Sequence, residues 1–196
     1  GCKNLIESFI YIFDNDYKLE KSSNKKQKLE EFYLKLLGDL HKTFLKYKVF
    51  FNEKKIKRTQ MDKLIKDVFI EDSNLDNNDK MDMCYFICNM YEINIVYLDI
   101  TKSLYKNYDS NFDKNIIIID YDGKLVPLIH IYGELLSNSD IENIIKHFKL
   151  KLNLKKITTY SLIELHELAE KNNIDILINN KKKTKNQLYN DLYVLS

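Results

Sequence analysis

The segment Ile93-Asn94-Ile95-Val96-Tyr97-Leu98 marks the point at which the pattern of the chain changes. It is short, rich in β-branched residues and bounded by polar residues, which is typical of a β-strand. The apolar run Ile116 to Ile119 predicts another strand, and Asp122-Gly123 separates it from the apolar residues between Leu125 and Ile129. Asp-Gly between two such runs is a strong hairpin signal. We therefore expect a small, mainly antiparallel sheet whose buried residues are Ile95, Tyr97, Ile117, Ile119, Val126 and Leu128.

Upstream of this sheet, apolar residues recur at the three- and four-residue spacing of helices. They predict a largely buried helix from Leu5 to Phe13, a long amphipathic helix from about Gln27 to Phe51, and shorter helices at Met61 to Phe69 and Asp79 to about Tyr91. The polar stretch Glu71 to Lys80 has no core-forming residues and predicts a surface loop. The expected fold class is therefore α+β, with a helix-rich N-terminal half packed on the sheet.

The segment after the sheet predicts one more helix. Ser139 and Glu142 have the spacing of a capping box, in which a hydroxyl and a carboxylate bind backbone N–H groups at a helix start, and the apolar residues of this helix extend to Phe148. The basic stretch Leu150 to Lys156 is expected to be a linker. We therefore expect an α+β domain at residues 1–150 and a small helical module at residues 157–196.

The module is expected to contain two helices joined by an extended loop. Ser161 with Glu164 and Thr184 with Gln187 form two further capping boxes, each followed by apolar residues at helical spacing. Asn172-Asn173 is expected to end the first helix. The predicted arrangement is therefore helix, extended loop, helix.

The same module resembles the SAP and Rho-termination N-terminal (Rho-N) modules, which bind nucleic acid. The resemblance covers about the last forty residues and rests on Tyr160-Ser161-Leu162-x-Glu164-Leu165-x-x-Leu168-Ala169, then Ile174, then Lys182-Lys183-Thr184-Lys185-x-x-Leu188-Tyr189. Lysines at a helix start, together with free backbone N–H groups, favour phosphate. We therefore expect DNA or RNA to contact Lys181, Lys182, Lys183, Thr184 and Lys185. The alternative is that these lysines only solubilise the helix start and that the module docks onto a protein.

Composition excludes several classes of function. The chain has 196 residues, and its 31 Lys and Arg against 29 Asp and Glu leave a net charge of only +2, so any basic surface must be local. The sequence has no phosphate-cradling glycine loop or dinucleotide-binding motif, so we expect no cofactor, nucleotide hydrolysis or hydride transfer. The first apolar run is too short to span a bilayer and lacks the features of a secretory signal. No membrane partner is expected.

The cysteines favour an intracellular protein with reduced thiols. Cys2, Cys84 and Cys88 are odd in number and form no CxxC motif. Cys84 and Cys88 lie one helical turn apart and could offer two soft metal ligands, but no further ligands lie nearby in the sequence. Core packing is the simpler role for both residues, and no metal site is predicted.

The larger N-terminal part is similar to lineage-specific proteins of nucleocytoplasmic large DNA viruses. The similarity rests on the run Leu5 to Ile12, on the order of the lysine-rich helices and on the Tyr-x-Ile-Asn-Ile strand at Tyr91 to Ile95, followed by the terminal module. It implies a viral protein of the virion or of the cytoplasmic viral factory of the host, with other viral proteins as partners. The corresponding function is a non-enzymatic one, the tethering of DNA or RNA to a virion or transcription-related complex. A structural virion protein whose module binds protein is an alternative.

The order of helices and strands also looks like the plan of ovarian-tumour (OTU) and papain-like cysteine peptidases. That resemblance implies a nucleophilic cysteine at the start of the first helix and a histidine on a later strand, roles that Cys2 and His130 could fill. The chain departs from the family, because it lacks the Asp-Gly-Asn-Cys approach to the nucleophile and carries Lys124 or Leu125 where the histidine is expected. We predict that Cys2 and His130 form no catalytic dyad. A deubiquitinase, active or degenerate, remains the alternative function.

Overall fold

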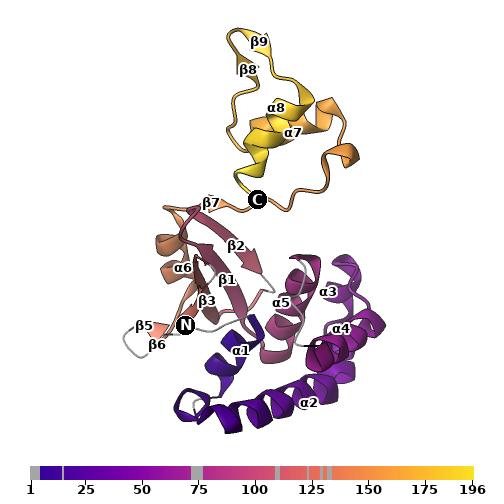
Figure 1. Ribbon diagram of the computed structural model, residues 1–196, viewed down its shortest axis with the longest axis vertical. Coiled ribbons are helices and arrows are strands. Elements are labelled where there is room, and N and C mark those ends of the chain that lie inside the picture. Colours follow the sequence, from indigo (N-terminus) through magenta and orange to yellow (C-terminus); the bar gives the residue numbers. More distant parts are fainter. Residues whose placement is uncertain are drawn as a thin grey trace.

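The computed structural model describes residues 5–14, 16–71, 77–108, 111–122, 124–128, 130–131 and 134–196 (Figure 1). The N-terminal part is helical and contains α1 (Leu5–Phe13), η1 (Tyr17–Leu19), α2 (Ser22–Lys46), α3 (Lys48–Glu53), α4 (Arg58–Glu71) and α5 (Asn77–Tyr91). The central part contains β1 (Asn94–Asp99), β2 (Leu104–Tyr108), β3 (Asn115–Tyr121), β4 (Lys124–Leu128), β5 (His130–Ile131), β6 (Glu134–Leu135), α6 (Asn138–Ile145) and β7 (Lys149–Leu150). The last part contains η2 (Ile157–Thr159), α7 (Leu162–Lys171), β8 (Leu177–Ile178), β9 (Lys181–Lys182) and α8 (Lys185–Tyr193). These elements confirm the expected α+β fold class.

The long helix expected from Gln27 to Phe51 is divided in two at Tyr47. The backbone of Tyr47 leaves helical geometry, with φ −111° and ψ 33°. Its ring packs edge-on against Phe112, with 5.8 Å between centroids, and its hydroxyl donates a hydrogen bond to Glu92 Oε1 over 2.5 Å. These partners lie far along the chain, so the helical periodicity around Tyr47 does not reveal the break.

The expected loop from Glu71 to Lys80 is shorter than the polar composition indicates. Glu71 still belongs to α4, and α5 begins at Asn77, while residues 72–76 lie outside the described part of the chain. The polar residues at both ends of this stretch are therefore helical.

The sheet has the strand order β4-β3-β1-β2-β7. The pairs β1–β2 and β3–β4 are antiparallel, whereas β1–β3 and β2–β7 are parallel. Tyr121 pairs with Lys124, which confirms the expected hairpin between β3 and β4. Its turn includes Asp122 in the left-handed region, with φ 50°, and the second turn residue, Gly123, lies outside the described residues.

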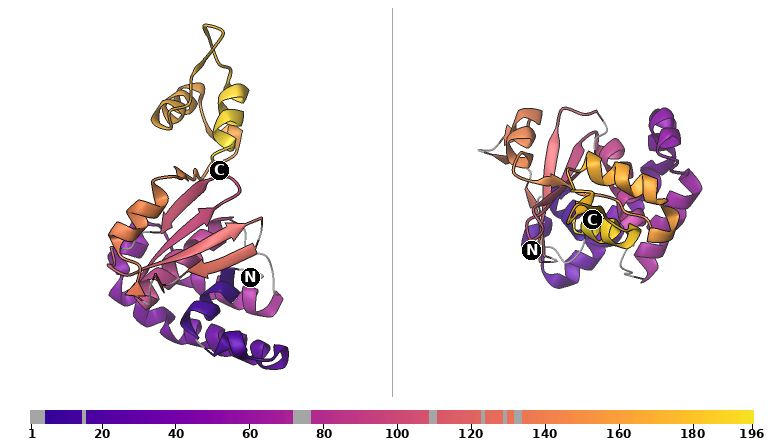
Figure 2. Two further views of the ribbon diagram at one scale, coloured as in Figure 1. Left: turned by 90° about the vertical axis from the view of Figure 1, so that its left-hand side faces the viewer. Right: turned by 90° about the horizontal axis from the view of Figure 1, so that it is seen from above.

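Apolar side chains fill both faces of this sheet, as alternation along each strand requires. Ile95, Ile116 and Ile118 join the larger core with α1, α2 and α5, whereas Val96, Leu98 and Ile117 join a second core under α6. Helices therefore cover both faces (Figure 2). This explains why β1 and β3 are apolar at nearly every position.

Five of the six expected sheet residues can be judged from the structure. Ile95 and Ile117 are fully buried, and Tyr97 and Ile119 are partly buried against the two cores. Val126 is 46% exposed, so the expectation that it is buried is wrong, because β4 is an edge strand and Val126 lies at its margin. The side chain of Leu128 lies outside the described part of the chain.

The capping box expected at Ser139 and Glu142 is wrong, because α6 is capped by Ser137 and Asp140. The Ser137 hydroxyl accepts from the Asp140 backbone N–H over 3.2 Å, and the Asp140 carboxylate accepts from the Ser137 backbone N–H over 2.8 Å. Leu136 before the cap and Ile141 after it are buried in the same core. This pair has the position of a hydrophobic staple, which fixes the helix start two residues earlier than the sequence pattern indicates.

The last part of the chain has its own hydrophobic core beyond one end of the sheet (Figure 1). Leu165, Ala169, Leu188 and Leu192 are buried between α7 and α8. Both expected capping boxes are confirmed, Ser161 with Glu164 and Thr184 with Gln187. The α7 helix ends before Asn172-Asn173 as expected, with Asn173 in the left-handed region at φ 57°.

The connection between α7 and α8 is a β-hairpin rather than an extended loop. Leu177 pairs with Lys182 and Ile178 with Lys181, which leaves Asn179-Asn180 as the turn. Both turn residues have positive φ, 51° and 60°, the combination required by a two-residue type I′ turn and tolerated best by Asn and Gly.

The stretch expected as a linker is divided between the sheet and the module. Leu150 belongs to β7, and Lys151 continues alongside β2 by donating its backbone N–H to the carbonyl of Tyr105 over 2.6 Å. Leu152 and Leu154 then pack against the module core.

Among the described helices, none is long and apolar enough to cross a membrane.

Candidate nucleic-acid interface

The five residues expected to contact nucleic acid are all in the described structure, but they occupy different environments. Lys181 and Lys182 form β9, and both side chains are exposed. They face solvent beside Leu177 and Ile178 of the paired strand, which are 43% and 46% exposed. The hairpin therefore presents two ammonium groups together with apolar surface.

Lys183 is held inside the module by an ion pair. Its Nζ lies 2.8 Å from Oδ2 of Asp191 on α8, and its side chain is only 14% exposed. In the sequence, Lys183 is not distinguishable from the other lysines of the run. In the structure, it pairs with Asp191 near the end of α8.

Thr184 is the N-cap of α8 and uses its side chain for that role. Its hydroxyl accepts from the Gln187 backbone N–H over 3.3 Å, and its own backbone N–H donates to the Gln187 side chain over 2.9 Å. The helix start that was expected to offer free groups to phosphate is therefore partly occupied by its own cap.

Lys185 is the first residue of α8 and lies near the start of α7. The Ser161 hydrogen bonds lower the pKa of the Glu164 carboxyl, and the charges of Lys185 and Lys155 lower it further. Lys155 and Lys185 therefore both lie near Glu164 in the first turn of α7.

Lys155 and Lys156 are two further lysines of the module that were not among the expected contact residues. Both side chains are exposed. The Lys155 backbone is fixed on both sides, since its N–H donates to the Tyr160 hydroxyl and its carbonyl accepts from the Tyr189 hydroxyl, each over 3.0 Å. We call Lys155, Lys156, Lys181, Lys182 and Lys185 the module basic surface. The signal in the sequence was the basic composition of residues 150–156, which we interpreted as that of a linker.

The residues of the peptidase alternative are only partly described. Cys2 lies outside the described residues, so the expectation that it forms no dyad with His130 stays a prediction. His130 is the first residue of β5, where it pairs with Leu135. Ser8, inside α1, is fully buried.

Cys84 and Cys88 are packed in the larger core, as expected, with exposures of 2% and 0%. The Cys88 thiol donates to the Tyr108 carbonyl over 3.4 Å. Burial raises the pKa of the Cys84 thiol to about 12, so it stays protonated at neutral pH. In the part of the chain that the structure describes, no cluster of His, Cys, Asp and Glu is suited to hold a metal ion.

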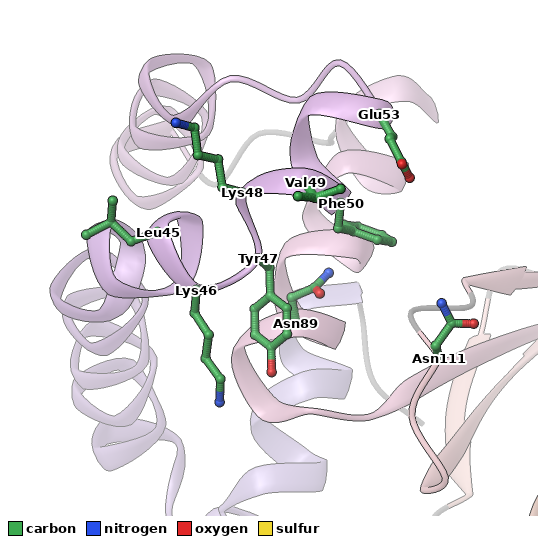
Figure 3. Close-up of a pocket in the computed structure, with 9 residues that line it drawn as sticks. All are labelled: Leu45, Lys46, Tyr47, Lys48, Val49, Phe50, Glu53, Asn89 and Asn111. Atoms are coloured by element: carbon green, nitrogen blue, oxygen red, sulfur yellow. The ribbon is translucent and has the colours of Figure 1, made fainter.

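An open pocket of about 450 Å³ lies at the junction of α2 and α3 (Figure 3). Tyr47 and Phe50 supply aromatic surface, and Asn89 of α5 lies behind them. Two of its polar groups are already paired, because Lys46 and Tyr47 both donate to the Glu92 carboxylate. These hydrogen bonds lower the pKa of Glu92.

Comparisons of this chain with models of protein families, with curated proteins and with solved structures give no match.

Proposed function

We propose that this chain is a nucleic-acid-associated protein without catalytic activity, which binds phosphodiester backbones through the module basic surface. The setting we propose is a virion or a cytoplasmic viral factory, where the protein tethers DNA or RNA to other viral proteins. That setting rests on the sequence resemblance described above.

The observation that carries the proposal is the exposed lysine pair of the β8–β9 hairpin. Lys181 and Lys182 project from a strand fixed by the Asn179-Asn180 turn, and within the described chain neither ammonium lies within ion-pair distance of a carboxylate. Residues 152–196, which pack around the module core, carry seven lysines against five acidic residues, a net charge of +2 that equals the net charge of the whole chain. The excess of positive charge therefore lies in this part of the chain.

The proposed contact is electrostatic and largely independent of sequence. Lysines neutralise phosphates and release condensed counterions, and this supplies most of the affinity of such surfaces. The hairpin adds apolar area from Leu177 and Ile178 next to the cations. Direct reading of bases is not part of the proposal.

A salt-dependent titration of the full chain with duplex and single-stranded DNA and RNA tests this function. In the variant Lys181→Gln/Lys182→Gln, affinity for all four ligands should fall, and the slope of log K against log salt on duplex DNA should decrease by about 1.8, because each phosphate contact contributes about 0.9. Lys171→Gln is the matched control, since Lys171 is an exposed lysine in the last turn of α7 in the same module. Equal affinity of the parent and the double variant at every salt concentration would show that the module is a protein-docking element.

A cysteine peptidase is a second candidate, and one observation favours it. The α1 helix, which follows Cys2 in the sequence, packs against β4, the strand that precedes His130 in the sequence. In the peptidase plan that the sequence resembles, the cysteine lies at the start of the first helix and the histidine on a later strand. A ubiquitin probe with a thiol-reactive end tests the candidate. Labelling that Cys2→Ala abolishes would establish the peptidase and refute the non-enzymatic reading.

A further inference from the structure

Two lysines lie side by side on the face of the sheet that packs on the larger core with α1, α2 and α5, outside the module basic surface. Lys106 of β2 is paired directly with Tyr97 of β1. Tyr105 pairs with Leu150 in the parallel β2–β7 ladder, and the Lys151 N–H donates to the Tyr105 carbonyl, so Lys151 lies one strand beyond Lys106 in the same row. Adjacent strands lie about 4.8 Å apart, so the two side chains start as neighbours.

The described partners of the two ammonium groups are a sulfur atom and aromatic rings. Lys106 Nζ lies 3.2 Å from Sδ of Met81 on α5 and 5.3 Å from the centre of the Tyr108 ring. Lys151 Nζ lies 5.6 Å from the centre of the Tyr97 ring. Neither group has a carboxylate within ion-pair distance among the residues described. A thioether and two aromatic faces attract a cation weakly, and they leave most of its hydrogen-bonding capacity unused.

The surroundings of the pair are positive. Burial lowers the pKa of Lys106 and of Lys151. Cys84 raises the pKa of Lys106 again in part, while repulsion from Lys151 and Lys54 lowers it further. Repulsion from Lys102 and Lys80 lowers the pKa of Lys151 further. The carboxylates of Asp99 and Asp120 partly compensate Lys151, but they already have other partners. Asp120 accepts from the Tyr97 hydroxyl and Asp99 from the Lys102 backbone N–H.

We propose that the Lys106–Lys151 pair is a binding site for a phosphate group, either as free phosphate or as part of a nucleic-acid backbone. Two half-buried cations that repel each other destabilise the folded chain unless an anion lies between them. Phosphate has the charge and the several acceptor oxygens that two ammonium groups require. The site belongs to β2 and the start of the module connection, so it is separate from the module basic surface (Figure 1).

Met81 provides a local reporter for this site. The chain has four methionines, and a full chain labelled with ¹³C at the methionine methyl groups would be titrated with inorganic phosphate against chloride at constant ionic strength. The Met81 methyl signal should shift and saturate, because its sulfur contacts Lys106. The Met61 methyl, on α4 and 1% exposed in the larger core, should stay in place and report that the fold is intact.

Variants identify the cations that bind the phosphate. Lys106→Gln and Lys151→Gln, singly and together, should weaken phosphate binding by at least about tenfold, the effect of losing one charge-assisted contact. Lys124→Gln, an exposed lysine on the opposite edge of the same sheet, should change nothing. The proposal is overturned if phosphate does not shift Met81, or if the double variant binds phosphate as tightly as the parent.

A second arm distinguishes the two sources of phosphate. Single-stranded and duplex oligonucleotides would be titrated against the parent, the Lys106→Gln/Lys151→Gln variant and the Lys181→Gln/Lys182→Gln variant. If the first variant loses phosphate binding but keeps its oligonucleotide affinity, the ligand is a small phosphate compound. If it loses both, the nucleic-acid backbone reaches from the module onto the sheet. Failure of the module proposal alone would appear only in the second variant.

Discussion

The ion pair between Lys183 and Asp191 makes a prediction that separates two lysines adjacent in the sequence. Replacing Lys183 by Met should destabilise the module without affecting nucleic-acid binding, whereas replacing Lys182 by Met should do the reverse. The difference follows from exposure, because Lys183 is 14% exposed and bonded to Asp191, whereas Lys182 is exposed on β9.

The magnitude follows from the geometry of the pair. Exposed ion pairs contribute about 0–1 kcal/mol, and hydrogen bonds to charged groups contribute about 1.5–3 kcal/mol. The bond of 2.8 Å has one mostly buried partner and one that is 42% exposed, so we expect a value between these ranges. Asp191→Asn should cost about 1–2 kcal/mol, because it leaves a mostly buried ammonium without its counter-charge. Lys183→Met should cost less, about 1 kcal/mol, because the new side chain still fills the space of the lysine stem.

Two measurements check this prediction. Leu188 and Leu192 belong to α8, and their side chains form part of the module core. Hydrogen exchange of their backbone amides reports the free energy of opening of the module. Salt titration with duplex DNA reports the number of phosphate contacts, which should fall by about one in Lys182→Met and by none in Lys183→Met. A Lys183→Met variant that loses a phosphate contact while its exchange rates stay unchanged would refute the assignment of Lys183 to the ion pair.

Three further predictions concern the fold. Ile117→Ala should lower the free energy of unfolding by about 2–5 kcal/mol, because Ile117 is fully buried between the sheet and α6, and a urea titration that shows no change would contradict the second core. Ser137→Ala should cost about 1 kcal/mol in the same assay and Ser139→Ala almost nothing, since only Ser137 caps α6; equal effects would place the helix start elsewhere. Cys84 and Cys88 should resist alkylation in a Cys2→Ala background until the chain is unfolded, because both thiols are buried, and fast native labelling counted by mass spectrometry would show an open core.

Sequence patterns predicted the elements that are stabilised by residues close together in the chain. The capping boxes at Ser161 and Thr184 and the periodicity of α1 and α5 involve residues within four positions of each other, so the sequence displays them directly. The β2 strand escaped prediction because Lys106 and Asn107 interrupt its apolar pattern. Lys106 occupies a core-side position beside Met81 of α5, and this position depends on packing between distant segments.

The roles of the residues in the candidate sites also depend on contacts that local sequence patterns do not predict. The run Lys181 to Lys185 looks uniform in sequence, yet a strand, an ion pair and a helix cap give its members separate roles. Lys106 and Lys151 lie 45 residues apart and become neighbours through the β2–β7 pairing alone. No periodicity or motif reports such a contact, because strand order is decided by the burial of the whole sheet.

The β7 strand also determines how far the module can reach. Two short backbone bonds hold it along β2, from the Lys149 N–H to Ser103 and from the Lys151 N–H to Tyr105, and the Lys102 side chain adds a bond to the Ser196 carbonyl. If a load on the module peels this strand from the sheet, residues 149–151 become a tether, because Leu152 and the residues that follow stay packed on the module. At about 3.3–3.6 Å per extended residue, these three residues span roughly 10–11 Å. The pairing of β7 with β2 would then determine how far the module can move from the sheet to reach a ligand.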